Sequence, residues 1–378
     1  MISVPSFAKI NLGLKIGPRR PDGFHELRTV YQTLALHDVV RVDVVPGSGI
    51  EIRSNDARVP LDESNTCYQV AERALAAIAG ARSEMQVPRL RVRPPAEEAG
   101  GKERGRSARD DKQEEIRARS TKVIIEIEKQ LPVQGGMGAA SSNAVATLLA
   151  MERALGVELS SADKLRIAAE VGSDSPLFLI GGTVLGVDRG KEVYPLPDLP
   201  RMNVVVVTPA IGVSTPKAFA RWDELNASGA GASSGIALTA SGAAGTINEF
   251  SARVSTWLSE SFPQALADAG PASGVPAVGG NRAETPLLDL VRAGIENDFE
   301  RVVFPEYPEL REVKELLLLR EGARYASLSG SGSTVYGLFD SDERATSAAE
   351  RLSVAGHKAI ATTTIRRAEY WKAVAGGQ

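Results

Sequence analysis

A glycine-rich segment, Pro132–Ser142 (PVQGGMGAASS), has residue types that bind phosphate. Glycines let the backbone adopt positive φ and approach a ligand closely. A helix expected directly after the segment would offer free N–H groups and the positive end of its dipole. Ser141 and Ser142 add hydroxyl groups for capping, phosphate or metal. The segment matches neither G-x-x-x-x-G-K-[ST] nor G-x-G-x-x-G, and a plain strand-to-helix turn is the alternative.

Two further segments carry polar groups suited to proton transfer. Lys9 and Asn11 stand two apart in the apolar stretch Ala8–Leu14 (AKINLGL), so they share one face of a strand. Asp174, in Gly172–Phe178 (GSDSPLF), precedes an expected helix start. The helix dipole there favours an ionised carboxylate, which can accept a hydroxyl proton. Taken alone, the first pair also suits a solvated strand face, and Asp174 an ordinary helix cap.

Two loops offer groups for recognition. The turn Arg20–Glu26 (RPDGFHE) presents Phe24, which could stack on a planar base, beside His25, which could hydrogen-bond to it. A second glycine-rich loop, Ser329–Thr334 (SGSGST), could bring N–H groups to a phosphate. Alone, each loop equally suits a surface turn or a tight hairpin.

Regular elements must position these groups. Alternating apolar residues predict strands at 2–16, 39–45, 121–128, 203–208, 326–329, 334–339 and 359–366. Helical spacing predicts helices at 66–79, 142–155, 161–171, 286–300, 309–320 and 342–355, and a short one capped by Ser175. Ser160 and Asp163 fit a capping box at the start of 161–171. Strands and helices mixed without strict βαβ alternation favour an α+β fold.

Two segments interrupt this pattern. Residues 94–120 contain seven acidic and seven basic side chains and one large aliphatic residue, Ile116. They cannot bury enough apolar area to offset their ordering entropy. Residues 226–281 thin to Gly, Ala and Ser around one amphipathic patch near Phe250–Leu266. We interpret both segments as insertions, with a partner-binding arm as the alternative for the first.

Length and charge narrow the class of protein. A chain of 378 residues suits two domains, and 44 basic against 47 acidic residues, a net charge of −3, argue against a general nucleic-acid binder. No apolar run is long enough to span a bilayer, and Lys9, Asn11 and Lys15 interrupt any signal peptide. Cys67 is the single cysteine, so no intrachain disulfide forms and a cytoplasmic location is expected.

The order of the motifs resembles that of the GHMP kinases from Ile2 to about Thr364, apart from the two insertions. The PDGFHEL stretch resembles the 4-diphosphocytidyl-2-C-methyl-D-erythritol kinase branch of that family. The resemblance implies a two-domain α+β fold. A ribosomal-S5-domain-2-like ATP domain is expected at 1–190, and a ferredoxin-like α/β sandwich at 201–378.

The resemblance also implies roles for single residues. Lys9 and Asp174 match the catalytic pair, with Asp174 as the base. ATP and the diphosphocytidyl-methylerythritol substrate are the expected partners, with no nucleic acid or membrane. Mg²⁺ is expected to bridge the phosphates, and its ligands are left unassigned. The matching substrate positions are Asn11, Phe24, His25, Thr215 and Phe219. The matching ATP positions are Asn65, Lys129, Pro132, Val133, Gln134, Gly135, Gly136, Met137, Gly138, Ala139, Ala140, Ser141 and Ser142.

The chain departs from the family pattern at a few positions. Ala139 and Ala140 replace glycines, and because alanine disfavours positive φ, we expect a reshaped loop or weaker nucleotide binding. Phe24 lacks the hydroxyl of the usual tyrosine, and Ser333 replaces a common proline. Alternatives are a homoserine or mevalonate kinase, whose substrates have no base to stack, and a non-catalytic GHMP-fold binding protein. An RNA binder of similar fold is disfavoured by the net charge.

Overall fold

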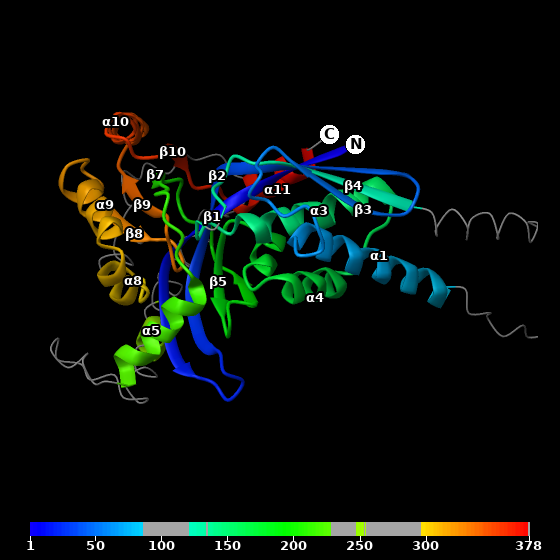
Figure 1. Ribbon diagram of the computed structural model, residues 1–378, viewed down its shortest axis with the longest axis horizontal. Coiled ribbons are helices and arrows are strands. Elements are labelled where there is room, and N and C mark those ends of the chain that lie inside the picture. The colour runs from blue at the N-terminus through cyan, green and yellow to red at the C-terminus, as the bar shows by residue number, and fades with distance from the viewer. Residues whose placement is uncertain (86–120, 134, 228–246, 253, 255–295, 377–378) are drawn as a thin grey trace, which may run out of the picture.

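The computed structural model describes residues 1–85, 121–133, 135–227, 247–252, 254 and 296–376, and two β-sheets with their helices form its body (Figure 1). The predicted insertion at 94–120 lies outside these residues. So do Gln134 and most of the predicted insertion at 226–281. Among the described residues, no helix is long and apolar enough to cross a membrane.

The first sheet has the order β3-β4-β2-β5-β6, with β1 also paired to β2. Among the described strands of this sheet, only β3 and β4 pair in parallel. Its strands are β1 (Ile2–Arg19), β2 (His25–Pro46), β3 (Gly49–Ser54), β4 (Thr121–Glu128), β5 (Thr183–Val187) and β6 (Glu192–Pro195). The helices α1 (Thr66–Met85), α3 (Ala139–Leu155) and α4 (Ser161–Val171), with the 3-10 helix η1 (Ser175–Leu179), pack together beside this sheet (Figure 1).

Strand β1 is irregular on both sides of the segment that carries Lys9 and Asn11. Its pairing with β2 shifts register between Phe7 and Lys9 and again between Asn11 and Gly13. Such bulges bend a strand and re-aim its side chains, and they are frequent beside active sites. The regular alternation of side chains along β1 is thus interrupted just before Lys9 and again just after Asn11.

The second sheet has the order β10-β7-β9-β8 and is antiparallel throughout. Its strands are β7 (Asn203–Val207), β8 (Tyr325–Leu328), β9 (Val335–Phe339) and β10 (Ala359–Thr363). Helices α5 (Thr215–Ala227), α8 (Glu300–Glu306) and α9 (Pro308–Leu319) lie between β7 and β8 in sequence, and α10 (Asp342–Val354) lies between β9 and β10. This order of strands and helices is that of a ferredoxin-like fold, so the predicted α+β class is confirmed.

The two sheets share buried contacts. One apolar cluster joins Ile10 and Leu12 of β1 to Val206 of β7 and Tyr336 of β9. The helix α11 (Arg367–Gly376) then returns to the first sheet, where Tyr370 and Val374 enter its core. The predicted domain limits, 1–190 and 201–378, stay predictions.

Contacts of α11 fasten the segment that follows Asp174. The Tyr370 hydroxyl donates to the Phe178 carbonyl (2.6 Å), and Trp371 Nε1 donates to the Ile180 carbonyl (2.9 Å). Gly181 has a φ of +69°, and a Cβ there would stand 2.4 Å from the Tyr370 ring. The aromatic ring therefore occupies the space that a side chain at position 181 would need.

Several predicted boundaries are wrong. Helix α1 runs through Gly80 to Met85, and α3 begins at Ala139 instead of residue 142. The short helix after residue 174 is a 3-10 helix with Asp174 in the cap position, so the predicted cap at Ser175 is wrong. The predicted strand at 39–45 covers only the last third of β2, and β3, β5, β6, α5 and α11 had not been predicted.

Other predictions hold. Ser160 Oγ accepts a hydrogen bond from the Asp163 backbone N–H (3.0 Å), so the predicted N-cap of α4 is confirmed. The Asp163 carboxylate accepts from the Ser160 hydroxyl (2.7 Å), so the two side chains meet without the reciprocal backbone bond of a full capping box. Strand β4 matches its predicted bounds, and β7, β8, β9, α9 and α10 lie within a residue or so of theirs. Most of the predicted helix 286–300 lies outside the described residues, and α8 begins where that prediction ended.

Candidate active site

The glycine-rich loop leads directly into α3. Gly136 and Gly138 have φ angles of +76° and +70°, and Gly138 is the N-cap of the helix. No side chain caps this helix start, so the N–H groups of its first turn remain available to an anion. The geometry of the loop and helix therefore suits a phosphate group, and we refer to this glycine-rich loop as the phosphate loop.

The two alanines do not strain this loop. Ala139 and Ala140 are the first residues of α3, and the positive φ angles of the loop belong to glycines. The expectation that these alanines would disfavour the loop conformation is therefore wrong, because a helical φ suits alanine well.

The second glycine-rich loop lies against the first. Ser329 Oγ donates to the Gly136 carbonyl (2.9 Å), and the Thr334 N–H donates to the Gly135 carbonyl (3.1 Å). A Cβ at Gly136 would stand only 2.2 Å from the Ser329 carbonyl oxygen. Glycine at position 136 thus serves both the backbone conformation and the close approach of the two loops.

Gly136→Ala is expected to lower the free energy of unfolding by about 3 kcal/mol, since the methyl group meets fixed backbone atoms at a left-handed φ. The matched control is Gly156→Ala at the C-cap of α3. That glycine has a similar φ of +62° but nothing within 4 Å of an added Cβ. Gly156→Ala therefore tests backbone strain alone, and it is expected to lower the free energy of unfolding by about 1 kcal/mol. Urea denaturation measures both, and equal losses would contradict the steric argument.

The predicted catalytic pair is in contact. Lys9 Nζ lies 3.1 Å from Asp174 Oδ2 and donates to Asn11 Oδ1 at 2.8 Å. The Lys9 side chain is 3% exposed and that of Asp174 is 30% exposed, so the carboxylate can still be reached from solvent. The Lys9 backbone N–H donates to the Met137 carbonyl (3.0 Å), which places the pair at the edge of the phosphate loop.

Tyr31, which the sequence analysis missed, also contacts Asp174. Its hydroxyl donates to Asp174 Oδ1 (3.1 Å). Burial first, and then the charge of Asp174, raise the pKa of Tyr31 well above its usual value, so the phenol stays a neutral donor. A Cβ at Gly186 or Gly190 would stand 2.5 or 2.7 Å from this side chain. The Tyr31 side chain thus occupies space that is free only because residues 186 and 190 are glycines.

A cavity of about 330 Å³ opens beside the phosphate loop and α1. It gathers most of the predicted ATP residues, namely Asn65, Lys129, Pro132, Val133, Gly135, Gly136, Gly138, Ala139, Ala140 and Ser141. Thr66 and Cys67 also line it, which no sequence pattern had indicated. Burial raises the pKa of the Cys67 thiol to about 12, so it lines the cavity as a neutral group.

Two predicted ATP residues face elsewhere. Met137 is buried in the apolar cluster between the sheets. Ser142 Oγ shares a hydrogen bond with Ser6 Oγ (2.8 Å) and is itself buried. These two side chains hold the loop from behind and do not line the cavity.

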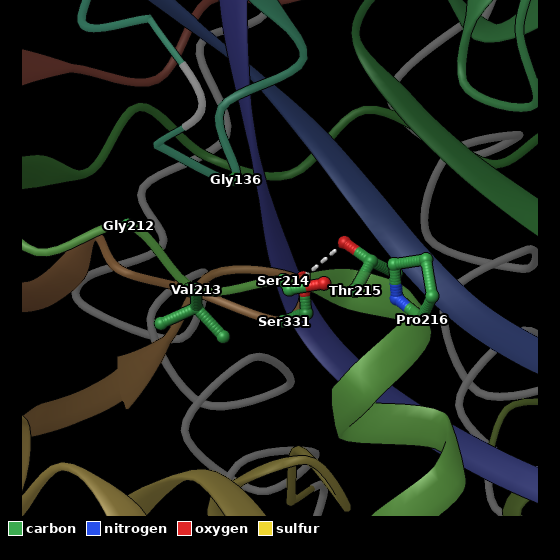
Figure 2. Close-up of a pocket in the computed structure, with 8 residues that line it drawn as sticks. Gly136, Gly212, Val213, Ser214, Thr215, Pro216 and Ser331 are labelled. Atoms are coloured by element: carbon green, nitrogen blue, oxygen red, sulfur yellow. Dashed lines mark hydrogen bonds between the residues drawn. The ribbon is translucent and has the colours of Figure 1, made fainter.

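A second cavity, of about 420 Å³, separates the phosphate loop from the start of α5 (Figure 2). Its lining is Gly136, Gly212, Val213, Ser214, Thr215, Pro216, Ser331 and Gly332. The hydroxyl groups of Thr215 and Ser331, both in its lining, share a hydrogen bond of 2.7 Å. The predicted substrate residue Thr215 therefore faces a cavity that borders the phosphate loop.

The remaining predicted substrate residues lie along α5 and the β1–β2 hairpin. The rings of His25 and Phe219 are stacked, with centroids 5.2 Å apart and 6° between their planes. His25 Nδ1 is 3.0 Å from the Gly17 carbonyl, and Nε2 is 2.9 Å from Asp223 of α5. Phe24 is exposed at the turn, with the Arg189 guanidinium 4.0 Å from its ring centre. The structure thus brings His25 into contact with Phe219, whereas Phe24 packs against Arg189 instead.

Metal ligands were left unassigned from the sequence. Over the described ranges, no group of three or more His, Cys, Asp and Glu side chains is arranged to hold a metal ion. Asp174 is the acidic member of the Lys9 pair beside the phosphate loop, and its side chain is partly exposed.

Comparison with known proteins shows the family of the chain. The GHMP kinases N terminal domain matches residues 107–182, and the GHMP kinases C terminal domain matches residues 283–358. Proteins of Solibacter usitatus and Acaryochloris marina named 4-diphosphocytidyl-2-C-methyl-D-erythritol kinase are each 31% identical to this chain. The alignments cover 88% and 92% of this chain, and 80% and 90% of those proteins.

A solved structure gives the same result. The crystal structure of a 4-(cytidine 5'-diphospho)-2C-methyl-D-erythritol kinase superposes with a TM-score of 0.61 at 25% identity, covering 96% of this chain and 99% of that one. The phosphate loop, the Lys9–Asp174 pair and the order of the two sheets thus occur in a chain similar to these kinases over most of its length. The chain therefore belongs to the GHMP kinase family, in its 4-diphosphocytidyl-2-C-methyl-D-erythritol kinase branch.

Proposed function

We propose that this kinase transfers the γ-phosphoryl group of ATP to the 2-hydroxyl of 4-diphosphocytidyl-2-C-methyl-D-erythritol. The products are the 2-phosphate and ADP, and the reaction is a step of the non-mevalonate route to isoprenoid precursors. The observation that carries the reaction type is the contact of Lys9 with Asp174 at the edge of the phosphate loop. The choice of acceptor is supported by the names of the relatives.

Asp174 would accept the proton of the attacking hydroxyl. As the oxygen–phosphorus bond forms and the bond to ADP breaks, the proton moves to the carboxylate, which is partly exposed and lies beside the loop. Lys9 would orient that carboxylate and stabilise the charge that develops on the transferred group. Tyr31 holds the other carboxylate oxygen, so the base presents one fixed orientation. Phosphoryl transfer depends mainly on such positioning.

The nucleotide would occupy the 330 Å³ cavity, with its phosphates at the N-terminus of α3. Mg²⁺ would neutralise phosphate charge; bound to nucleotides, it usually keeps several waters and takes one or two carboxylates. Asp174 already contacts Lys9 and Tyr31 through its two oxygens and is assigned as the base, so the phosphates of the nucleotide and water would supply the ligands of the metal. A metal held mainly by the nucleotide and water needs no cage of acidic side chains.

The cytidine would bind where α5 meets the hairpin. His25 and Phe219 already present parallel faces, which suit a pyrimidine ring. Because these two rings contact each other directly, a base that enters between them would displace α5 from the hairpin. Thr215, at the start of the same helix, would then contact the substrate nearer the phosphate loop.

The test is ADP release with ATP, Mg²⁺ and each candidate acceptor in turn: the cytidyl substrate, homoserine and mevalonate. We expect release only with the cytidyl substrate, and a 2-phosphate product by phosphorus NMR. Release with homoserine or mevalonate instead would overturn the choice of substrate. Silence with all three, in protein shown to be folded, would favour a binding role.

A further inference from the structure

A buried carboxylate lies behind the nucleotide cavity, where no motif marked it. Asp38 of β2 is fully buried, next to the point where β4 ends and the chain turns into the phosphate loop. Its backbone partner on β1 is Ser6, and the last β2–β4 pair joins the neighbouring residue, Val39, to Glu128. Asp38 therefore faces the chain that leaves β4.

Four donors surround this carboxylate. Oδ1 accepts from the N–H groups of Gln130 and Leu131, each at 2.7 Å. Oδ2 accepts from Asn143 Nδ2 at 3.1 Å and pairs closely with Lys129 Nζ. A buried charge is tolerated when it is paired and fully hydrogen-bonded, as this one is.

These contacts hold both ends of the phosphate loop. Gln130 and Leu131 precede the loop, and Asn143 lies in α3 just after it. Asn143 in turn accepts a hydrogen bond from Ser6 Oγ (2.5 Å), which secures the helix end to β1. One carboxylate thus fixes the separation between the entrance of the loop and its exit.

The same carboxylate sets the direction of a cavity-lining cation. Lys129 lines the nucleotide cavity, yet its side chain is only 5% exposed. An ammonium group on a flexible stem is placed by its counter-ion. Without Asp38, the lysine would lose that partner while still lying in a buried position.

We propose that Asp38 is a positioning residue for the nucleotide: it fixes the two ends of the phosphate loop and holds the cavity-lining residue Lys129 in place through its ammonium group. This rests on the proposed kinase function for the identity of the nucleotide. It does not depend on which acceptor is phosphorylated. Asp38 itself lies behind the cavity and acts only through the groups that it binds.

The decisive variant is Asp38→Asn, which keeps the shape but not the charge. Whichever way the amide lies, its NH₂ group would face donors. We expect about 30-fold weaker binding of ADP with Mg²⁺ by calorimetry, the effect of losing strong charge-assisted hydrogen bonds. The KM for ATP should rise in parallel, and the KM for the cytidyl substrate should change by less than about threefold.

The matched control is Glu128→Gln, which removes an ion pair on the same two strands. Glu128 accepts from Arg41 of β2 at 2.7 Å, but both side chains are substantially exposed. Exposed pairs contribute little, so ADP binding should stay within about twofold of the parent. ADP binding by Asp38→Asn within threefold of the parent would overturn the proposal, and so would an equal loss of affinity for both substrates.

A second variant covers the case in which Asp38→Asn does not fold. Asn143→Ala removes the link from Asp38 to α3, together with the hydrogen bond from Ser6, and leaves the three donors of the 129–131 segment in place. ADP binding should weaken by about fivefold, the value of one hydrogen bond. Unchanged ADP binding would show that Asp38 does not place the helix end. Because calorimetry needs no acceptor, it remains decisive even if the cytidyl substrate proves wrong.

Discussion

Asp174→Asn is expected to lower kcat by about 10³-fold, within the range for loss of a general base. The amide keeps the size of the side chain and can still accept a hydrogen bond from Tyr31, but it cannot take a proton. The KM values should change little, because Asp174 is proposed to act on a hydroxyl in the transition state. Steady-state ADP release with the cytidyl substrate measures both parameters.

The control for this variant is Asp340→Asn. Asp340 is a surface aspartate that pairs with Arg324 and Arg344, and we expect normal turnover when it is changed. The unfolding temperature of Asp174→Asn should stay within about 5 °C of the parent, which separates lost chemistry from lost fold. Turnover by Asp174→Asn within about tenfold of the parent would reject its role as the base.

Lys9→Met is expected to lower kcat by about 10²-fold or more, since the ammonium group would no longer stabilise charge on the transferred phosphoryl group. Methionine retains most of the apolar stem, which packs under Gly138. The partly exposed Asp174 keeps its contact with Tyr31 and access to water. The fold should therefore survive while turnover falls, as steady-state kinetics and thermal unfolding would show together.

Lys15→Met, on the same strand, is expected to lower stability and to leave turnover unchanged. Lys15 Nζ lies 2.9 Å from Asp298, whose carboxylate is almost fully buried and whose pKa is raised by that burial. Removing the cation leaves the buried carboxylate with the Ile16 N–H but without its paired charge, and should lower the free energy of unfolding by about 3 kcal/mol. The fraction that remains folded should turn over normally. If both lysine variants lost only stability, the catalytic role of Lys9 would be untenable.

Strand β4 and strand β2 show what sequence patterns can and cannot predict. The run TKVIIEIE alternates cleanly, and β4 has its predicted bounds. The 22-residue β2 includes Arg28, Gln32 and Asp38, and it is paired on both sides. Polar residues that bond within a buried sheet break the alternation of apolar side chains, so only the last third of this strand had a recognisable pattern.

Helices α5 and α11 were missed for a different reason. Each buries only two residues, Ala218 and Trp222 in α5, and Tyr370 and Val374 in α11. A helix that packs through so narrow a contact has no broad apolar face by which periodicity could find it. Tertiary contacts, not local pattern, decide that these segments are helical.

In the candidate site, too, sequence patterns indicate some residues and not others. Glycines, Lys9 and Asp174 could be found because their residue types suggest chemistry. Tyr31 could not, because its place depends on register. Counting evenly from the pair Arg19–His25 would put Thr33 opposite Asn11, whereas the irregularities in β1 bring Tyr31 there. Bulges of this kind depend on the packing of the whole sheet, which a single strand sequence does not reveal.

The return of α11 to the first sheet affects how the protein matures during synthesis. The ribosome completes Lys9, the phosphate loop and Asp174 long before it reaches Tyr370. Until then, the space beside Gly181 and the carbonyl groups of Phe178 and Ile180 lack the partners that α11 supplies. A chain that ends before residue 367 would therefore contain the whole phosphate loop. The segment after Asp174 in that chain would lack the hydrogen bonds that Tyr370 and Trp371 donate.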